Sequence, residues 1–269
     1  MELEKHPFNK EFCWSVPKGP YSYLSTKQVK DFSRYGFIIL DNVFDEDLMK
    51  ELISIIDPLE AQITEDLKKF DEGKFFISRA EEITFTTHLV TQSEQLKKFS
   101  KHKIFSSLCR DLIGSDVRLY WDQAVYKKAG TRDEFPWHQD NGYTFLEPQA
   151  YLTCWLALTD TDAKNGCPWV IPSVHRQGTL RHELTDLGYE LTLDSSQAIP
   201  IHLSAGSMAV FSSLTPHRTG PNITSDPRKA YILQYAPDRA VRKIDDNLTE
   251  LANEESRQFL IVEKGKLIN

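Results

Sequence analysis

The chain has 269 residues, of which 40% are hydrophobic and 26% charged, which is long enough for one domain with its own core. Its formal net charge of -7 offers no basic surface of the kind that nucleic-acid binding needs. No apolar run approaches the roughly 20 residues that span a bilayer, and residues 1–15 lack the apolar core of a secretory signal. We therefore expect a cytoplasmic monomer or homodimer with no nucleic-acid or membrane partner.

The first 116 residues favour helices. The pattern predicts a helix over Lys27–Tyr35, followed by a short buried strand at Phe37–Leu40. A second predicted helix runs from its N-cap Asp45 to Ile56, and Pro58 argues against its continuation. Residues 60–116 are expected to be mostly helical, with interruptions at 75–78 and 83–87.

From Val117 onward, short runs of β-forming residues alternate with turn signals such as Asn165-Gly166. This pattern predicts a mainly β protein with flanking helices, built on an antiparallel barrel or jelly roll. No repeat or linker marks a second domain, so residues 1–269 are expected to form one domain. Its parts would be a helical portion at 1–116, a β core at 117–240 and an extension at 241–269. The predicted strands are Val117–Lys127, Phe135–Asp140, Tyr151–Leu158, Trp169–Ile171, Ala198–Leu203, Ser207–Phe211 and Ala230–Tyr235.

Three side chains of the second half form a candidate metal site. His138 and Asp140 are two positions apart on a predicted strand, which would place both on one face. His217 is expected near the end of the later strand that begins at Ser207. Two imidazoles and one carboxylate on one face of a metal are typical of non-haem Fe(II) oxygenases. Each residue alone would more often be a hydrogen-bonded turn residue, and a zinc hydrolase on a similar barrel is a rival interpretation.

Arg228 adds to this constellation. If a short connection separates it from His217, the two residues would lie opposite each other on an antiparallel pair. A guanidinium there could hold one end of a carboxylate ligand by two parallel hydrogen bonds, and the Thr219 hydroxyl could assist. The alternative is an exposed Arg228 paired with Asp226.

The residues that carry these predictions resemble a known family, the phytanoyl-CoA dioxygenases, which are Fe(II)- and 2-oxoglutarate-dependent oxygenases. The resemblance covers roughly residues 25 to 240 and includes the spacing His138-x-Asp140, His217 and Arg228. One departure is Pro172-Ser-Val-His175, where relatives usually have Pro-Gly-Ser-His. The supporting motifs are Phe32-Ser-Arg-Tyr-Gly-Phe-Ile-Ile-Leu-Asp41, Trp137-His-Gln-Asp140, Asn165-Gly-Cys-Pro-Trp-Val-Ile-Pro172 with His175-Arg176, and Gly206-Ser-Met-Ala-Val-Phe211 before Pro216-His217.

The resemblance implies a double-stranded β-helix, cupin-like core with Fe(II) and the cosubstrates 2-oxoglutarate and O2. His138, Asp140 and His217 would be the catalytic metal ligands, and Asp140 favours hydroxylation, because halogenating relatives lack this carboxylate. The residues expected to bind 2-oxoglutarate are Arg228, Thr219, Lys128 or its neighbour Lys127, Gln123 and Trp155.

The expected activity is hydroxylation of an unactivated C–H bond of a small molecule in secondary-metabolite or small-acid metabolism. The alternatives are an acyl-CoA hydroxylase of the same family and a non-catalytic jelly-roll protein that binds a small molecule. No concentrated phosphate-binding cluster that would suit coenzyme A is evident. The candidate residues of the substrate pocket are Trp137, Tyr143, Phe145 and Trp169.

Overall fold

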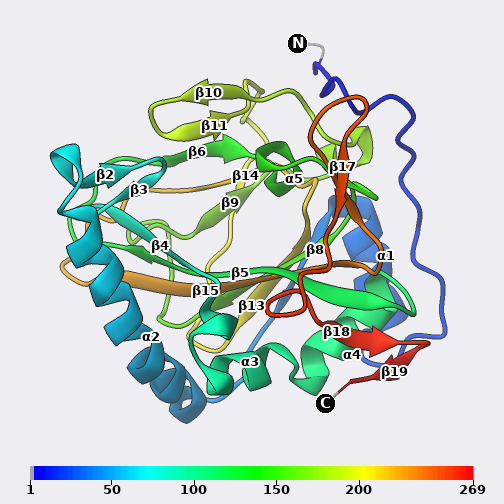
Figure 1. Cartoon of the computed structure of the whole chain (residues 1–269), viewed down its shortest axis with the longest axis horizontal. Coiled ribbons are helices and arrows are strands. Elements are labelled where there is room, and N and C mark those ends of the chain that lie inside the picture. The colour runs from blue at the N-terminus through cyan, green and yellow to red at the C-terminus, as the bar shows by residue number, and fades with distance from the viewer. Residues whose placement is uncertain (1–2, 269) are drawn as a thin grey trace.

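Two β-sheets packed face to face form the core of the computed structural model, which describes residues 3–268 (Figure 1). The large sheet has the order β1-β13-β8-β15-β5-β4-β3-β2, and β18 with β19 joins it at β5. The small sheet has the order β12-β9-β14-β6. Neighbouring strands are antiparallel throughout, which confirms the predicted fold class, a mainly β jelly roll with flanking helices.

The large sheet consists of β1 (Phe37–Leu40), β2 (Lys74–Phe75), β3 (Ser78–Arg79), β4 (Ile83–Thr87), β5 (Val117–Lys127), β8 (Leu152–Ala157), β13 (Met208–Ser212), β15 (Arg228–Pro237), β18 (Leu260–Glu263) and β19 (Lys266–Leu267). The small sheet consists of β6 (Phe135–His138), β9 (Pro168–Val170), β12 (Ile199–Pro200) and β14 (His217–Thr219). Peripheral strands are β7 (Leu146–Glu147), β10 (Glu183–Thr185), β11 (Gly188–Glu190), β16 (Val241–Lys243) and β17 (Thr249–Leu251). The helices are α1 (Thr26–Tyr35), α2 (Glu46–Leu67), α3 (Glu94–Ser100), α4 (Lys103–Leu112) and α5 (Asp140–Tyr143), with 3-10 turns at Asp71–Gly73, Leu89–Thr91 and Val174–Gln177.

The predicted first helix and strand are confirmed. Ser25 accepts a hydrogen bond from the Gln28 backbone, and the Gln28 side chain accepts one from the Ser25 backbone, which forms a capping box at the start of α1. Gly36 ends the helix with φ +88°, a conformation that glycine adopts without strain.

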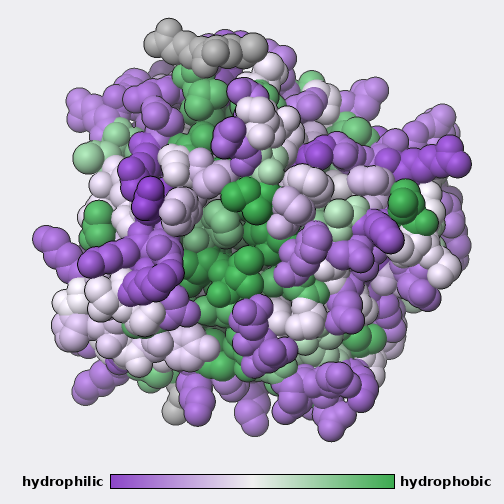
Figure 2. Space-filling view, turned by 180° about the vertical axis from the view of Figure 1, so that it is seen from behind, coloured by the Kyte–Doolittle hydropathy of each residue, from purple (hydrophilic) through white to green (hydrophobic). Residues whose placement is uncertain are grey.

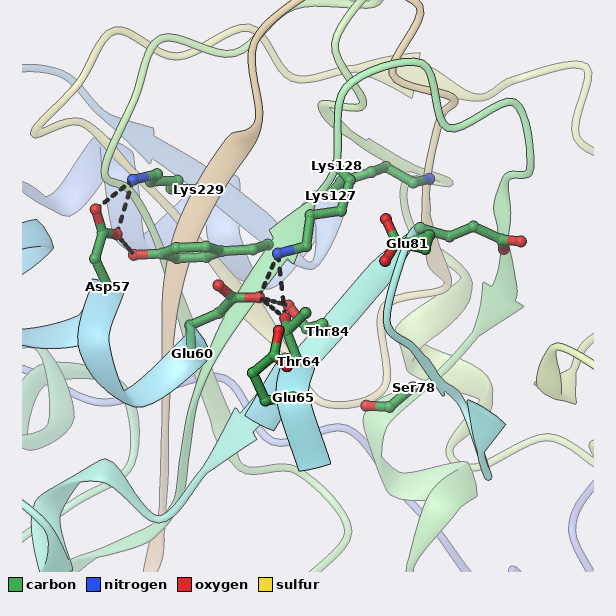
Figure 3. A network of polar contacts seen from close by, with 12 residues as sticks. Asp57, Glu60, Thr64, Glu65, Ser78, Glu81, Thr84, Lys127, Lys128 and Lys229 are labelled. Atoms are coloured by element: carbon green, nitrogen blue, oxygen red, sulfur yellow. Dashed lines mark hydrogen bonds and ion pairs between the residues drawn. The ribbon is translucent and has the colours of Figure 1, made fainter. Parts of the chain in front are cut away.

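The sequence suggested that helix α2 ends before Pro58, but the helix continues to Leu67. Polar contacts to the large sheet hold it on both sides of the proline (Figure 3). Asp57 accepts hydrogen bonds from Lys229 Nζ at 2.7 Å and from the Tyr126 hydroxyl at 2.8 Å. Glu60 Oε1 accepts one from Thr84 Oγ1 at 2.7 Å. These tertiary contacts offset the roughly 3 kcal/mol that a proline costs inside a helix.

The hydrophobic core has two main layers. One lies between the helices and the outer face of the large sheet and includes Phe105, Tyr231 and Tyr235. The other lies between the two sheets and includes Trp155 and Phe211. On the face opposite that of Figure 1, hydrophobic residues gather in the middle and hydrophilic residues surround them (Figure 2). Within residues 3–268, each helix is too short or too polar to cross a bilayer.

The pairing of β5 with β15 shifts by one residue near their middle. Gln234 pairs with Trp121, whereas the next residue, Tyr235, pairs with Leu119, so Tyr120 is an extra residue in β5. Such a bulge reverses which face the following side chains occupy. As a result Tyr120 and Trp121 both line the cavity described below, together with Gln234.

Three predictions about the strands that carry the candidate site are wrong. The strand that begins at Phe135 ends at His138, and Asp140 begins the single turn of α5. His217 does not end the strand that contains Ser207 but begins β14, in the other sheet. Arg228 pairs with Lys127 of β5 and not with His217.

The turn at which this chain departs from the family motif packs on the end of α1. Ser173 adopts φ +70°, a left-handed conformation that a glycine would adopt without strain. Its hydroxyl donates to the Arg34 carbonyl at 3.0 Å and its N–H to the Tyr35 carbonyl at 2.9 Å. His175, two residues on, is fully buried, and its Nε2 lies 3.2 Å from the Ser33 carbonyl. The turn therefore connects the small-sheet side of the molecule to α1.

We expect His175 to make the protein sensitive to acid. Burial lowers the pKa of His175 to about 4, so below pH 6.5 the unfolded chain binds a proton that the folded chain does not. The contribution of neutral His175 to the free energy of unfolding is fully present above pH 6.5 and is lost as the pH falls toward 4. Urea unfolding at about pH 7.5 and about pH 5 should show that wild type loses about 2 kcal/mol more than His175→Gln between these conditions. The glutamine amide can still donate to Ser33, and equal losses in both proteins would contradict the prediction.

Candidate metal centre

His138, Asp140 and His217 converge although they come from different strands and a turn. Their ligand atoms all lie within 4.8 Å of one another, and all three residues are buried or nearly so. Asp140 Oδ1 is 3.9 Å from His138 Nε2 and 3.6 Å from His217 Nε2. The two imidazoles meet because His138 and His217 are register partners on β6 and β14.

Both imidazoles are oriented by backbone carbonyls two residues earlier in the chain. His138 Nδ1 is 2.9 Å from the Pro136 carbonyl, and His217 Nδ1 is 3.0 Å from the Thr215 carbonyl. Protonated at Nδ1, each ring presents the lone pair of Nε2 to the shared space, which is the usual arrangement of a metal-binding histidine.

Burial sets the charge of these groups. Burial lowers the pKa of His138 to about 3 and that of His217 to about 4, so both rings are neutral at physiological pH, as metal ligands must be. Burial also raises the pKa of Asp140 above its ordinary value. Thr153 on β8 donates to Asp140 Oδ2 at 2.6 Å, which leaves Oδ1 directed toward the two histidines. A cation at this point would compensate for a buried carboxylate.

Gln139, between the two ligands of the motif, is fully buried and holds the ligand turn in place. Its Nε2 donates to the carbonyls of Gly178 at 3.0 Å and Leu214 at 2.6 Å, and its Oε1 accepts from the Leu180 N–H at 2.7 Å. Leu214 belongs to the connection that leads to His217. One side chain thus ties the turn with His138 and Asp140 to the segment that carries the third ligand.

We expect Gln139→Leu to weaken metal binding roughly 10–100-fold, the usual effect of losing a partner that orients metal ligands. Isothermal titration with Fe(II) without oxygen would measure this. Gln149→Leu is the matched control, because Gln149 is also buried and bonded to the backbone of Thr179, but its side chain makes no hydrogen bond to residues 138–140. Both variants should lose stability, since each leaves buried polar groups unpaired. Equal metal affinities in the two variants would refute the positioning role.

The guanidinium of Arg228 is buried between the sheets, and no acidic side chain among residues 3–268 pairs with it. Its Nη1 donates to the Val125 carbonyl at 3.1 Å, while Nε and Nη2 are buried and have no hydrogen-bond partner in the described part of the chain. The guanidinium carbon lies 5.2 Å from the centre of the Trp155 ring. Burial lowers the pKa of Arg228 to about 10, so it stays charged at neutral pH. Two orphaned donors on a buried cation favour an anionic ligand at this point.

The side chain of Lys127 links the strand of Arg228 to Thr219. Lys127 is the register partner of Arg228, and its Nζ is 3.4 Å from the Thr219 carbonyl and 2.5 Å from that of Gly220. The Thr219 hydroxyl is also buried without a partner. Burial lowers the pKa of Lys127 to about 7. Gly166 makes room for this lysine, since a Cβ there would come within 2.9 Å of Lys127 Cδ.

The structure does not bring Lys128 into this group, so of the two lysines that the sequence left open only Lys127 lies beside Arg228. Side chains alternate between the two faces of a strand, so when Lys127 points between the sheets the next residue points toward α2. Lys128 Nζ lies 2.5 Å from Glu60 Oε1 and 3.3 Å from Thr64 Oγ1, both on α2 (Figure 3).

Of the aromatic residues expected around a substrate, only Tyr143 lines the cavity next to His138 and Asp140. Phe145 packs instead on His6 and Phe8 of the N-terminal arm. Trp137 and Trp169 contact Arg218 on the opposite face of the small sheet. Each is next to a residue that points inward, and because side chains alternate along a strand, the tryptophans point outward. Gln123, expected near the cosubstrate, also lines the cavity.

Sequence reasoning missed several residues of this centre. Thr153 and Gln234 approach Asp140 from β8 and β15, and nothing in the sequence spacing predicts this contact. Gln139 lies inside the quoted motif but was assigned no role. Part of the cavity wall comes from the end of α2 and from the β2–β3 hairpin, which were interpreted only as helix and interruption.

The residues present fit an iron ion with a carboxylate cosubstrate. The donor set is two neutral imidazoles and one carboxylate, with no cysteine among the clustered ligands to favour zinc. The orphaned donors of Arg228 and the Thr219 hydroxyl supply a separate place for a carboxylate.

A jelly roll with two histidines and one carboxylate at a single point defines the class, a cupin-like protein with a non-haem metal site. A family model described as phytanoyl-CoA dioxygenase (PhyH) matches residues 32–230, and the chain belongs to that family. The predicted family and enzyme class, dioxygenase, are thereby confirmed. Phytanoyl-CoA dioxygenase of Arabidopsis thaliana is 23% identical over 267 residues, covering 85% of this chain and 94% of the relative.

Solved structures show the same fold. The carbocyclase SnoK from nogalamycin biosynthesis, described as non-haem and alpha-ketoglutarate-dependent, has a TM-score of 0.67 at 17% identity and covers 93% of this chain and 97% of its own. EvdO2 from Micromonospora carbonacea var. aurantiaca, complexed with 2-oxoglutarate, has a TM-score of 0.64 at 22% identity and covers 84% and 95%.

Proposed function

We propose that this protein is a non-haem Fe(II)- and 2-oxoglutarate-dependent dioxygenase that hydroxylates an unactivated C–H bond of a small molecule. The observation that carries the proposal is the pairing of two buried features. His138, Asp140 and His217 form a ligand cluster with ligand atoms within 4.8 Å, and Arg228 has two unpaired donors between the same sheets.

In this proposal each residue has one task. His138, Asp140 and His217 hold the iron, and Thr153 keeps Asp140 Oδ1 directed toward it. Arg228 pairs with the distal carboxylate of 2-oxoglutarate, with the Thr219 hydroxyl as a further donor and Lys127 beside it. Iron with 2-oxoglutarate and O2 supplies the oxidation, in which the cosubstrate becomes succinate and CO2 and the substrate gains one oxygen atom. The buried walls around the cluster exclude water.

We propose further that residues 1–269 act as one oxygenase domain. The N-terminal strand β1 and the C-terminal strand β18 belong to the same large sheet as β5 and β15, so the helical portion and the extension both complete the jelly roll.

Anaerobic titration tests the proposal against a non-catalytic binding protein. Adding Fe(II) and then 2-oxoglutarate should produce a weak visible charge-transfer band, and a jelly-roll module that only binds a small molecule should produce none. Admitting air and a metabolite extract should then release succinate and give a product heavier by one oxygen atom. Absence of the band with both components present would contradict the proposed function, and zinc-supported activity would favour a hydrolase instead.

A further inference from the structure

The cavity at the metal centre is large enough for a medium-sized organic molecule. It has a volume of about 570 Å3 and extends from His138 and Asp140 outward to Phe70, Phe75 and Phe76. Volumes of a few hundred to about 1,000 Å3 are typical of sites for drug-sized ligands. The walls come from the end of α2, the β2–β3 hairpin, β4, β5 and α5.

The lining is apolar and, among residues 3–268, carries no lysine or arginine. Aromatic and aliphatic side chains dominate it, including Phe85, Trp121, Phe135 and Tyr143. The polar groups that it offers are neutral hydroxyls and amides, such as those of Gln123. Apart from the metal ligands, its one charged side chain is Asp66, which pairs with Lys69 at 2.5 Å. A buried anion on the substrate would have no partner here, and this is costly.

The mouth of the cavity does not suit the phosphates of coenzyme A either. Lys68 and Lys74 pair with Glu65 and Glu72, each at 2.8 Å, and Lys69 is occupied by Asp66. Residues 65–82, which form this rim, contain six acidic and four basic side chains. The local charge therefore repels a polyphosphate group.

Three phenylalanines at the rim expose their rings to solvent. Phe70 is 49% exposed, Phe75 61% and Phe76 57%. The Phe70 and Phe75 rings lie 5.1 Å apart, and Phe76 lies 6.4 Å from Tyr143 inside the cavity. Phe76 also has φ +51°, an uncommon conformation for a bulky residue, at the tip of the β2–β3 hairpin. Exposed apolar side chains around an apolar opening gain free energy when an apolar molecule covers them.

We propose that the substrate is an uncharged, mostly hydrocarbon molecule containing rings, which enters between Phe70, just after the end of α2, and the hairpin tip at Phe76. This inference rests on the proposed function, because it assigns the substrate class of the same metal site. Flat rings stack against the aromatic walls, and the neutral amides and hydroxyls accommodate a few ketone or hydroxyl groups. Acyl-CoA thioesters and small zwitterions are excluded, since both need charged partners that the lining lacks.

The test uses fluorescence, so it does not depend on turnover. Protein loaded without oxygen with Fe(II) and 2-oxoglutarate is titrated with Nile red, an uncharged apolar dye, and the dye is then displaced by competitors. Progesterone, an uncharged four-ring ketone, should displace it and quench tryptophan fluorescence from Trp121. Palmitoyl-CoA should compete at least roughly tenfold less well, and free coenzyme A should not compete.

Two variants examine the entrance. Phe76→Glu should weaken Nile red and progesterone binding by roughly tenfold or more, while the charge-transfer band with 2-oxoglutarate is unchanged. Phe76→Gly relieves the positive φ and so protects the fold, yet it should weaken binding in the same direction. Leu184→Glu is the control, since Leu184 is 65% exposed on β10 and does not line the cavity.

The outcomes separate the two proposals. No charge-transfer band means that the proposed function fails, whatever the dye does. A normal band with no dye binding, or with palmitoyl-CoA competing as well as progesterone, overturns the assigned substrate class. If both Phe76 variants bind Nile red and progesterone with wild-type affinity, the proposed entrance is wrong.

Discussion

Replacing Asp140 with alanine is expected to abolish product formation. Asp140 is the anionic member of the cluster, and without it the two neutral imidazoles hold a divalent ion by fewer and weaker contacts. The measurement is anaerobic Fe(II) titration followed by detection of succinate and hydroxylated product. Both the charge-transfer band and the product should disappear.

The control for Asp140→Ala is Thr153→Val, which removes the hydrogen bond at 2.6 Å to Asp140 Oδ2 and keeps the carboxylate. We expect Thr153→Val to retain iron binding and part of the activity. Both variants should fold, because valine suits a strand such as β8 and Asp140 lies in the turn of α5 outside the sheets; circular dichroism would check this. Succinate release still coupled to product in Asp140→Ala would refute the ligand assignment.

Replacing Arg228 with methionine is expected to raise the KM for 2-oxoglutarate by at least roughly tenfold. A charge-assisted hydrogen bond contributes about 1.5–3 kcal/mol, and Arg228 has two buried donors free to make such bonds. Methionine fills similar volume without charge. Because Arg228 is buried with no acidic partner, the cosubstrate-free variant should be as stable as wild type or more so.

Arg218→Met is the matched control for Arg228→Met. Arg218 lies in β14 but points to the other face, where it contacts Glu134 and the rings of Trp137 and Trp169. Its loss should leave the KM for 2-oxoglutarate unchanged. An unchanged KM in Arg228→Met, measured by succinate release at varied cosubstrate concentration, would move the carboxylate site elsewhere.

In these expectations both sheets contribute to the site. The small sheet supplies His138, His217 and Thr219, while the large sheet supplies Arg228, Lys127 and Thr153. The iron ligands and the cosubstrate anchor therefore depend on how the sheets are packed, and substitutions in the core between them should disturb both functions at once.

Much about this protein followed from local patterns. Strand β5 was predicted with its observed bounds, α1 was predicted to within one residue, and the ligand residues were recognised from their types and spacing. Local signals succeed here because capping, turn chemistry and alternation act over a few residues. His217 and Arg228, which are distant in the chain, were recognised from their chemistry, and the family resemblance supported them.

Contacts between distant segments decided the rest. Alternation in a strand makes adjacent residues face opposite ways, but it does not say which face is inside. The sequence therefore left Lys128 and Lys127 as alternatives and placed Trp137 in the pocket. The strand that pairs with Arg228 depended on the order of strands in the sheet. That order joins segments far apart in the chain, so no periodic pattern in the sequence predicts it. The cavity wall depended on α2 continuing past Pro58, which polar contacts with β4, β5 and β15 make possible. Sequence alone determined the chemical groups and the fold class, whereas the tertiary packing determined which groups meet, because burial and pairing free energies arise only when the sheets and α2 come together.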